Sequence, residues 1–206
     1  GGLLGLAVTV LATALRSPKK YIGILLIPAL LIAFYWQAGS VMKSRTETID
    51  DYQTESSAKT RIEAWSAGWG MIKAHPMTGV GVASFMAAFP DFSNKQTRVA
   101  HNTFVQIASE WGVIGGVSYT LIILLALKSL LRNGRLMTEL VQKGLDPALL
   151  HINEAILVGL LGFASCAVFL SLQGYEIFYF LIIMTTAINQ VVKKWEPEPS
   201  PSGREE

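Results

Sequence analysis

Two uncharged stretches of the sequence are as long as the apolar interior of a lipid bilayer is thick. Residues 21–42 and residues 155–175 contain no Asp, Glu, Lys or Arg. As helices, each would extend roughly 30 Å, which is enough to cross the hydrocarbon core. The chain is 51% hydrophobic and only 16% charged. A soluble domain of 206 residues does not bury that much apolar surface, so we expect a membrane protein.

Three further apolar segments complete the predicted bundle. Residues 1–15 carry no charge and are expected to be the end of a spanning helix that is incomplete at its start. Residues 111–131 are uncharged except for Lys128, whose long side chain can reach the membrane surface. Residues 177–192 follow 155–175 after a short turn and predict an antiparallel hairpin. The expected fold class is all-α, a polytopic transmembrane helical bundle with five spans.

The positions of the basic residues predict the orientation of these spans. More than half of the 17 Lys and Arg residues flank the first connection, the connection after the third span and the C-terminal tail. Such residues collect on the cytoplasmic side, so the long segment between the second and third spans should face outward. The expected division is two spanning helices (1–42), a large helical extracytoplasmic loop (43–110), a spanning helix (111–131), a cytoplasmic loop (132–154), a helical hairpin (155–192) and a disordered tail (193–206).

The extracytoplasmic loop contains a predicted helix. Ser56 or Ser57 is expected to cap its start, and the helix should end near His75, because the residue before Pro76 is disfavoured in the α region. Spacings of three and four residues predict one apolar stripe on it, formed by Ile62, Trp65, Trp69 and Ile72.

Arg61 lies on this helix, one turn before Trp65. Its guanidinium can lie along the indole while its fork points outward, an arrangement suited to phosphate. An interfacial helix also carries Arg simply to meet lipid headgroups, and the spacing favours neither interpretation over the other.

After the helix, Gly79 and Gly81 form a G-V-G turn. A glycine-rich loop can hold phosphate, but a plain tight turn needs the same residues and is the stronger interpretation.

The segment VAHNTFVQIASEWG predicts a second helix that runs directly into the third span. His101 and Asn102 would lie at its outer mouth, and Glu110 about two turns deeper. A neutral His101 can take a proton from a hydroxyl nucleophile. The alternative, favoured by composition alone, is a histidine that caps the helix or faces the interface.

Other chemistries find little support in the sequence. No two His or Cys residues stand at metal-ligand spacing, and there is no nucleophile elbow, P-loop or dinucleotide motif. We therefore expect no metal and no cofactor. The net charge of +2 and the scattered basic residues predict no nucleic-acid partner.

Three stretches together resemble the signature region of the O-antigen ligase and O-antigen polymerase family. They are T-R-I-E-A-W (60–65), M-I-K-A-H-P-M-T-G-V-G (71–81) and A-H-N-T-F-V-Q-I-A-S-E-W-G-V-I-G (100–115). The resemblance covers about residues 40–131. Residues 44–58 resemble, more weakly, the O-glycosylation ligases associated with exosortase systems. The family implies a GT-C type glycosyltransferase of the bacterial inner membrane with a periplasmic catalytic loop, of which this chain would be the C-terminal half.

The resemblance also implies a reaction. A glycan would pass from an undecaprenyl diphosphate carrier to a hydroxyl acceptor on lipid A core, protein or another glycan, without a metal. Arg61 matches the family's diphosphate-binding Arg, and His101 matches the essential His assigned to acceptor activation. Further substrate contacts are predicted at Trp65, Gly79, Gly81, Asn102 and Glu110.

Two alternatives stay open at this point. A polymerase of the same family would extend glycan on the lipid carrier, and nothing in this part of the chain separates it from a ligase. A non-enzymatic transporter or flippase subunit would also have polytopic helices and an outer loop. It would need ionisable residues in mid-span, which these spans almost lack.

Overall fold

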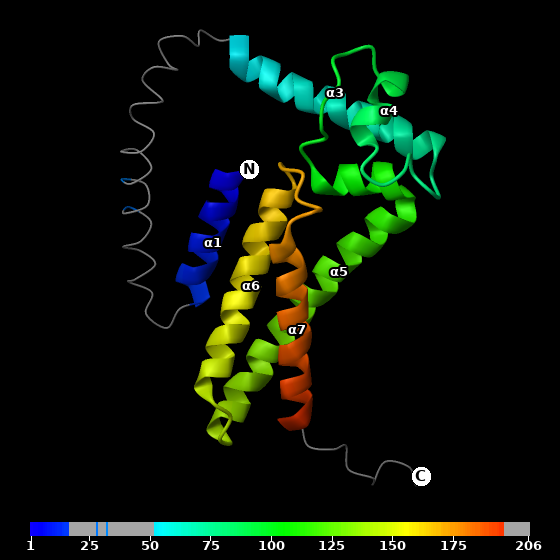
Figure 1. Cartoon of the computed structure of the whole chain (residues 1–206). Helices are drawn as coiled ribbons and strands as arrows, with labels where there is room; N and C mark the ends of the chain where they lie inside the picture. The colour runs from blue at the N-terminus through cyan, green and yellow to red at the C-terminus, as the bar shows by residue number, and fades with distance from the viewer. Residues whose placement is uncertain (17–27, 29–31, 33–51, 196–206) are drawn as a thin grey trace, which may run out of the picture.

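The computed structural model describes residues 1–16, 28, 32 and 52–195. In this part of the chain there is no strand, and the principal elements are α1 (Gly2–Arg16), α3 (Tyr52–Ala74), α4 (Phe85–Phe92), α5 (Thr103–Gln142), α6 (Pro147–Ala167) and α7 (Glu176–Trp195). α1 and α7 flank α6, α5 crosses this group, and α3 and α4 lie over one end (Figure 1). The predicted all-α helical membrane bundle is confirmed.

Three of the described helices are long and apolar enough to span a membrane: α5, α6 and α7. α1 is a shorter apolar helix. The span predicted at 21–42 lies outside the described residues, apart from residues 28 and 32. Of the predicted disordered tail (193–206), residues 193–195 are helical as the end of α7, and the rest lies outside the described residues. The segment 132–154, expected as a loop, is mostly helical, because α5 continues to Gln142 and α6 begins at Pro147.

Local sequence accounts for the tight turn between α5 and α6. Gly144 has a φ of 104°, a left-handed conformation that ends a helix at little cost in glycine. The N–H of Leu145 then donates to the carbonyl oxygen of Leu140 at 3.0 Å. The carboxylate of Asp146 accepts the N–H of Ala148 at 2.9 Å and caps α6, whose first residue is a proline.

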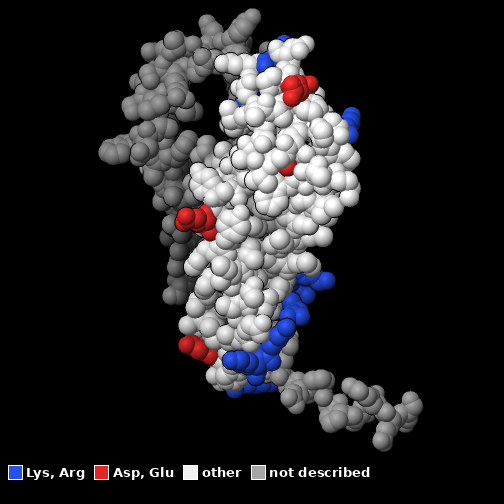
Figure 2. Space-filling view, turned by 45° about the vertical axis from the view of Figure 1, so that its right-hand side comes forward, with Lys and Arg blue, Asp and Glu red and all other residues white. Residues whose placement is uncertain are grey.

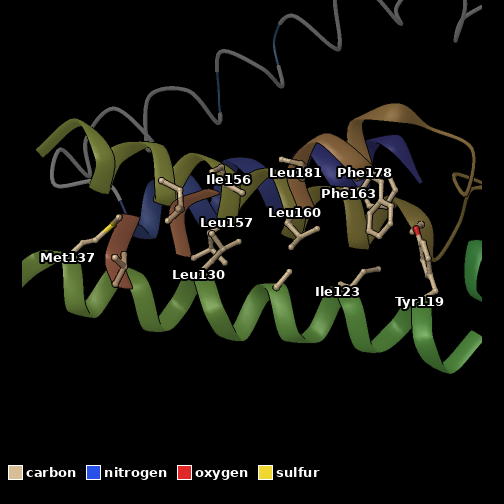
Figure 3. Close-up of a cluster of buried hydrophobic side chains, with 14 of the residues drawn as sticks. Tyr119, Ile123, Leu130, Met137, Ile156, Leu157, Leu160, Phe163, Phe178 and Leu181 are labelled. Atoms are coloured by element: carbon tan, nitrogen blue, oxygen red, sulfur yellow. The ribbon is translucent and has the colours of Figure 1, made fainter. Parts of the chain in front are cut away.

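Apolar side chains of α5, α6 and α7 form the core of the bundle. Tyr119, Ile123 and Leu130 project from α5 toward Leu157 of α6 and Phe178 of α7 (Figure 3). The opposite side of α5 is exposed along its apolar length, as expected for a helix that faces lipid.

Polar side chains add hydrogen bonds between these helices. Asn189 of α7 accepts from Ser129 at 2.5 Å and from Asn133 at 2.6 Å, both on α5. Asn153 of α6 donates to the carbonyl oxygen of Leu130 at 3.0 Å. Buried hydrogen bonds of this kind fix the rotation of each helix about its axis, which apolar packing against lipid specifies only weakly.

Charge is distributed unevenly along the bundle. Lys and Arg gather at the end opposite α3 and α4 (Figure 2), where α5 contributes Lys128, Arg132 and Arg135 and α7 contributes Lys193 and Lys194. The membrane-spanning part between the two ends shows a nearly uncharged surface in this view. The bundle therefore has one basic end, and the residues 60–115 that carry the family resemblance lie toward the other.

α3 differs from its prediction in its start and in its buried face. It is already helical at Tyr52, so the start predicted at Ser56 or Ser57 is wrong, whereas its end at Ala74, next to His75, is confirmed.

The apolar stripe predicted on α3 coincides only in part with its packing face, because Ile72 is buried and Trp65 is partly buried. Ile62 is 62% exposed and Trp69 is 58% exposed, whereas Ala64, Ala67 and Met71 are buried. Small side chains on this second face let α4 and the segment before α5 approach the α3 backbone closely.

Candidate functional site

Trp65 connects α3 to the chain just before α5. Its indole N–H donates a hydrogen bond to the carbonyl oxygen of Ala100 at 2.9 Å. Ala100 is fully buried in a small core shared with Ala64, Met71 and Phe85. The residue after Ala100 is therefore held at a defined place relative to α3.

His101 is that next residue, and it has an unusual backbone. Its φ is 48°, in the left-handed region, and its side chain is exposed. Burial of part of the imidazole and, second, the positive charge of Arg61 both lower the pKa of His101 below its ordinary value of 6.5. The charge effect requires that Arg61 lies within electrostatic range of His101, so the structure places the two predicted catalytic residues in the same region.

Asn102 forms the start of α5. Its side-chain oxygen accepts the N–H groups of Phe104 at 3.0 Å and Val105 at 3.1 Å, which is the arrangement of an N-cap. The capping role considered for His101 is thus filled by Asn102.

Glu110 is buried, with 2% of its surface exposed, and its carboxylate accepts three hydrogen bonds. Ala83 N–H donates at 3.0 Å, Phe85 N–H at 3.3 Å and the side-chain amide of Gln106 at 3.1 Å. The first two donors belong to the start of α4, where Ser84 makes no side-chain capping bond. The carboxylate of α5 therefore caps α4 from a distance of 25 residues or more in sequence.

The loop between α3 and α4 docks on a kink in α5. Gly112 has a φ of 73°, and a Cβ there would lie 2.5 Å from the carbonyl oxygen of Met77. The N–H of Val113, freed by the kink, donates to the carbonyl oxygen of Pro76 at 2.8 Å. The kink therefore provides a free backbone N–H that binds the turn at the end of α3.

Gly79 and Gly81 take part in the same contact. Gly79 has a φ of 66°, and a Cβ there would lie 2.4 Å from the carbonyl oxygen of Glu110. The N–H of Gly79 donates to the backbone carbonyl oxygen of His75 at 2.9 Å, and the N–H of Gly81 donates to the backbone carbonyl oxygen of Glu110 at 3.0 Å. These donors are used within the protein, so the turn interpretation explains both glycines, and their substrate contacts stay a prediction.

Three important residues of this region were not predicted from the sequence. Gly112 lies in an otherwise regular apolar helix, and its only sequence signal is a glycine directly after Trp111. Ser109 donates to the carbonyl oxygen of Gly68 at 3.2 Å and joins α5 to α3. Gln106 binds the carboxylate of Glu110. Gly112 and Ser109 act through contacts with residues distant in sequence, which no local pattern predicts. Gln106 and Glu110 are four residues apart on the same helix, a spacing at which side chains can meet.

Within residues 1–16 and 52–195 there is no group of three or more His, Cys, Asp and Glu side chains arranged to hold a metal ion. The candidate groups are the guanidinium of Arg61 and the titratable imidazole of His101, while the carboxylate of Glu110 is buried about two turns farther along the chain, against the start of α4. A guanidinium can bind an anion and a neutral imidazole can take up a proton.

Comparison with known proteins adds the family. The curated proteins give no match to the chain. A family model described as O-antigen ligase (Wzy_C) matches residues 1–120, more than half of the chain. The match includes α1, α3, α4 and the beginning of α5, and hence both Arg61 and His101. With this match and a helical membrane bundle, the chain belongs to the O-antigen ligase family.

Proposed function

We propose that this chain carries the catalytic residues of a bacterial inner-membrane enzyme that transfers a glycan from undecaprenyl diphosphate to a hydroxyl acceptor. The observation that carries the proposal is the hydrogen bond from Trp65 to Ala100, which holds the helix of Arg61 against the residue that precedes His101. Partial burial and, second, the charge of Arg61 lower the pKa of the imidazole. Membership of the O-antigen ligase family supports a membrane enzyme of the glycan ligase or polymerase type.

In this reaction the acceptor hydroxyl oxygen attacks the anomeric carbon of the glycan. The bond from that carbon to the carrier's phosphate oxygen breaks, and the diphosphate leaves with the bonding electron pair. His101 takes the hydroxyl proton, and its lowered pKa keeps the imidazole neutral and ready at neutral pH. Arg61 stabilises the negative charge that gathers on the leaving diphosphate. The negative charge on the leaving group and the proton of the acceptor are thus met by two different side chains.

The basic end of the bundle supports a periplasmic position for this site. Lys and Arg collect on the cytoplasmic side of spanning helices, and here their largest patch lies at the end opposite α3, although some basic residues also lie at the α3 end (Figure 2). Single cysteines at Gln96 and Gln142, both exposed, in a Cys166→Ala background should react from the periplasm and the cytoplasm, respectively. Labelling of both from the same side would exclude the orientation.

The function is tested by a transfer assay with the purified full-length protein. A lipid-linked oligosaccharide is supplied with lipid A core in one reaction, with an acceptor protein in another, and alone in a third. Glycan on lipid A core or on protein identifies a ligase and its acceptor. Longer glycan on the carrier in the third reaction identifies a polymerase. Retention of the unchanged lipid-linked oligosaccharide in all three reactions, by correctly folded protein, would contradict the proposal.

A further inference from the structure

A cavity of about 900 Å³ lies between the α4 region and the outer ends of α5 and α7. Its walls include Met86 of α4, Trp111 and Tyr119 of α5, and Phe178 and Tyr179 of α7. We call it the α4–α7 cavity. Its volume lies in the range of small-molecule sites, and it is distinct from the exposed position of His101.

The charge of the α4–α7 cavity argues against an anionic ligand. Among the described residues that line it, Glu110 has the only charged side chain, and there is no Lys, Arg or His. A phosphate placed there would meet a buried carboxylate with no cation to offset the repulsion. The cavity therefore suits an uncharged ligand, in contrast to the cationic surface at Arg61.

The walls also contain polar atoms that have no partner. Within the described part of the chain, the side-chain oxygens of Gln106, Tyr119 and Gln173 are buried without a hydrogen bond, and all three residues line the cavity. Gln106 is 7% and Tyr119 is 9% exposed. Because the Gln106 amide nitrogen donates to Glu110, its oxygen is the free acceptor. A rotation of these side chains toward the cavity would let a ligand's hydroxyl groups satisfy them.

Aromatic rings complete the chemical character of the walls. Trp111 and Tyr179 are about half exposed, at 51% and 53%, while Phe178 and Tyr119 are packed ring to ring at 4.8 Å between centroids. Ring faces provide flat apolar surface against which the C–H face of a sugar can lie, and free acceptors beside them bind its hydroxyl groups. Val99, two residues before His101, lines the same cavity, which connects it to the proposed reaction.

We infer that the α4–α7 cavity binds an uncharged sugar unit of the donor or acceptor glycan, while the diphosphate stays outside it at Arg61. This inference rests on the proposed function, since glycan transfer supplies the ligand. The unpartnered oxygens of Gln106 and Tyr119 bind sugar hydroxyls, and the carboxylate of Glu110 excludes phosphate.

The test measures occupancy of the cavity without requiring transfer. Ser118 lines the cavity, and Ser66 is exposed on α3 outside it. In a Cys166→Ala background of the full-length protein in nanodiscs, Ser118→Cys and Ser66→Cys are alkylated with a maleimide. The probes are octyl β-D-glucoside and octyl phosphate, which share a tail, each below its micelle-forming concentration.

Octyl glucoside should slow alkylation of Ser118→Cys, leave Ser66→Cys unchanged, and act at lower concentration than octyl phosphate. Adding Tyr119→Phe, which removes one hydroxyl, should raise the half-protecting concentration of the glucoside about twofold to tenfold. Gln106→Met should do the same, and either variant suffices if the other fails to fold. Equal protection by both probes would show that the cavity binds only alkyl chains. No protection by either probe would show that the cavity holds only water. Either outcome overturns the inference.

Kinetics then distinguish the two sources of the sugar. Inhibition of transfer by octyl glucoside that is competitive with the acceptor assigns the cavity to the acceptor sugar. Inhibition competitive with the lipid-linked donor assigns it to the donor sugar. If the wild-type protein transfers no glycan but Ser118→Cys is protected, the proposed function fails and the sugar site stands. If the wild-type protein transfers glycan but Ser118→Cys is not protected, the sugar site fails and the proposed function stands.

Discussion

The indole N–H of Trp65 donates to the carbonyl oxygen of Ala100 at 2.9 Å, across 35 positions of the sequence. This bond holds the α3 helix against the backbone that immediately precedes His101. Arg61 lies one turn before Trp65 on the same helix, so the bond also sets the separation of Arg61 and His101. The proposed site thus depends on one hydrogen bond between a helix and a loop.

Trp65→Phe removes that bond while keeping an aromatic ring. We expect a loss of about 0.5–1.5 kcal/mol in stability. We also expect the transfer rate to fall by about one to two orders of magnitude, because misplaced catalytic groups lose more rate than the bond itself contributes to folding. Thermal unfolding and transfer assays measure the two effects. Trp69→Phe, at an exposed position of the same helix, is the control and should change neither.

Arg61→Lys tests whether the guanidinium binds diphosphate through its paired N–H groups. A single ammonium keeps the charge but cannot form two parallel hydrogen bonds, so transfer should fall at least about tenfold. Arg98, whose Nε donates to the carbonyl oxygen of Gln96 at 3.1 Å, provides the matched control. If Arg61→Lys transfers glycan as fast as Arg98→Lys, the diphosphate-binding role of Arg61 is excluded and a contact with lipid headgroups is the remaining interpretation.

His101→Asn separates a chemical role of His101 from a backbone role. Asn tolerates the left-handed φ of 48° at this position, so folding should be retained. Loss of a positioned base should reduce the rate by about 10² to 10⁴ at matched amounts of folded protein. His101→Ala should lose the same activity. A folded Asn variant that transfers at more than about a tenth of the wild-type rate would remove His101 from proton transfer.

Arg61→Gln should raise the pKa of His101. Burial is the larger cause of the lowered pKa and remains, so we expect only a partial return toward 6.5. Because the neutral imidazole is the active form, the wild-type protein should keep its activity to a lower pH than a protein with an ordinary histidine. NMR titration of the imidazole, assigned with His75→Gln and His151→Gln variants, measures the shift directly. An unchanged or lowered pKa in Arg61→Gln would contradict the proximity of the two residues.

Glu110→Gln should loosen α4. The substitution replaces one carboxylate oxygen with an amide N–H₂, which cannot accept from the N–H groups of Ala83 or Phe85. We expect a loss of about 1.5–3 kcal/mol, the usual contribution of a hydrogen bond to a charged group. Hydrogen exchange should become faster in residues 83–92 than in α6. Glu63→Gln on α3 is the control, and equal exchange in the two variants would exclude the capping role.

Much of the fold follows from local patterns in the sequence. Apolar runs of membrane length predict α5, α6 and α7, because the length of a helix and the transfer of its side chains into lipid depend on few neighbours. Pro76 predicts the end of α3, because its ring restricts the residue before it. The motifs also identify Arg61 and His101 as the residues of interest before any contact is known.

Tertiary structure alone decides how these residues are used. Ile62 and Trp69 have helical spacing yet are exposed, because α4 packs on the alanine face of α3.

The sequence predicts Glu110 as a substrate contact. In the structure its carboxylate caps α4 and borders the α4–α7 cavity. Gly112 kinks α5 because the turn after α3 requires its space and its neighbour's N–H. Composition and periodicity determine which segments become helices and enter the membrane. The proximity of Arg61 to His101 arises from contacts between segments 25 to 41 residues apart, whose geometry exists only once the chain is folded.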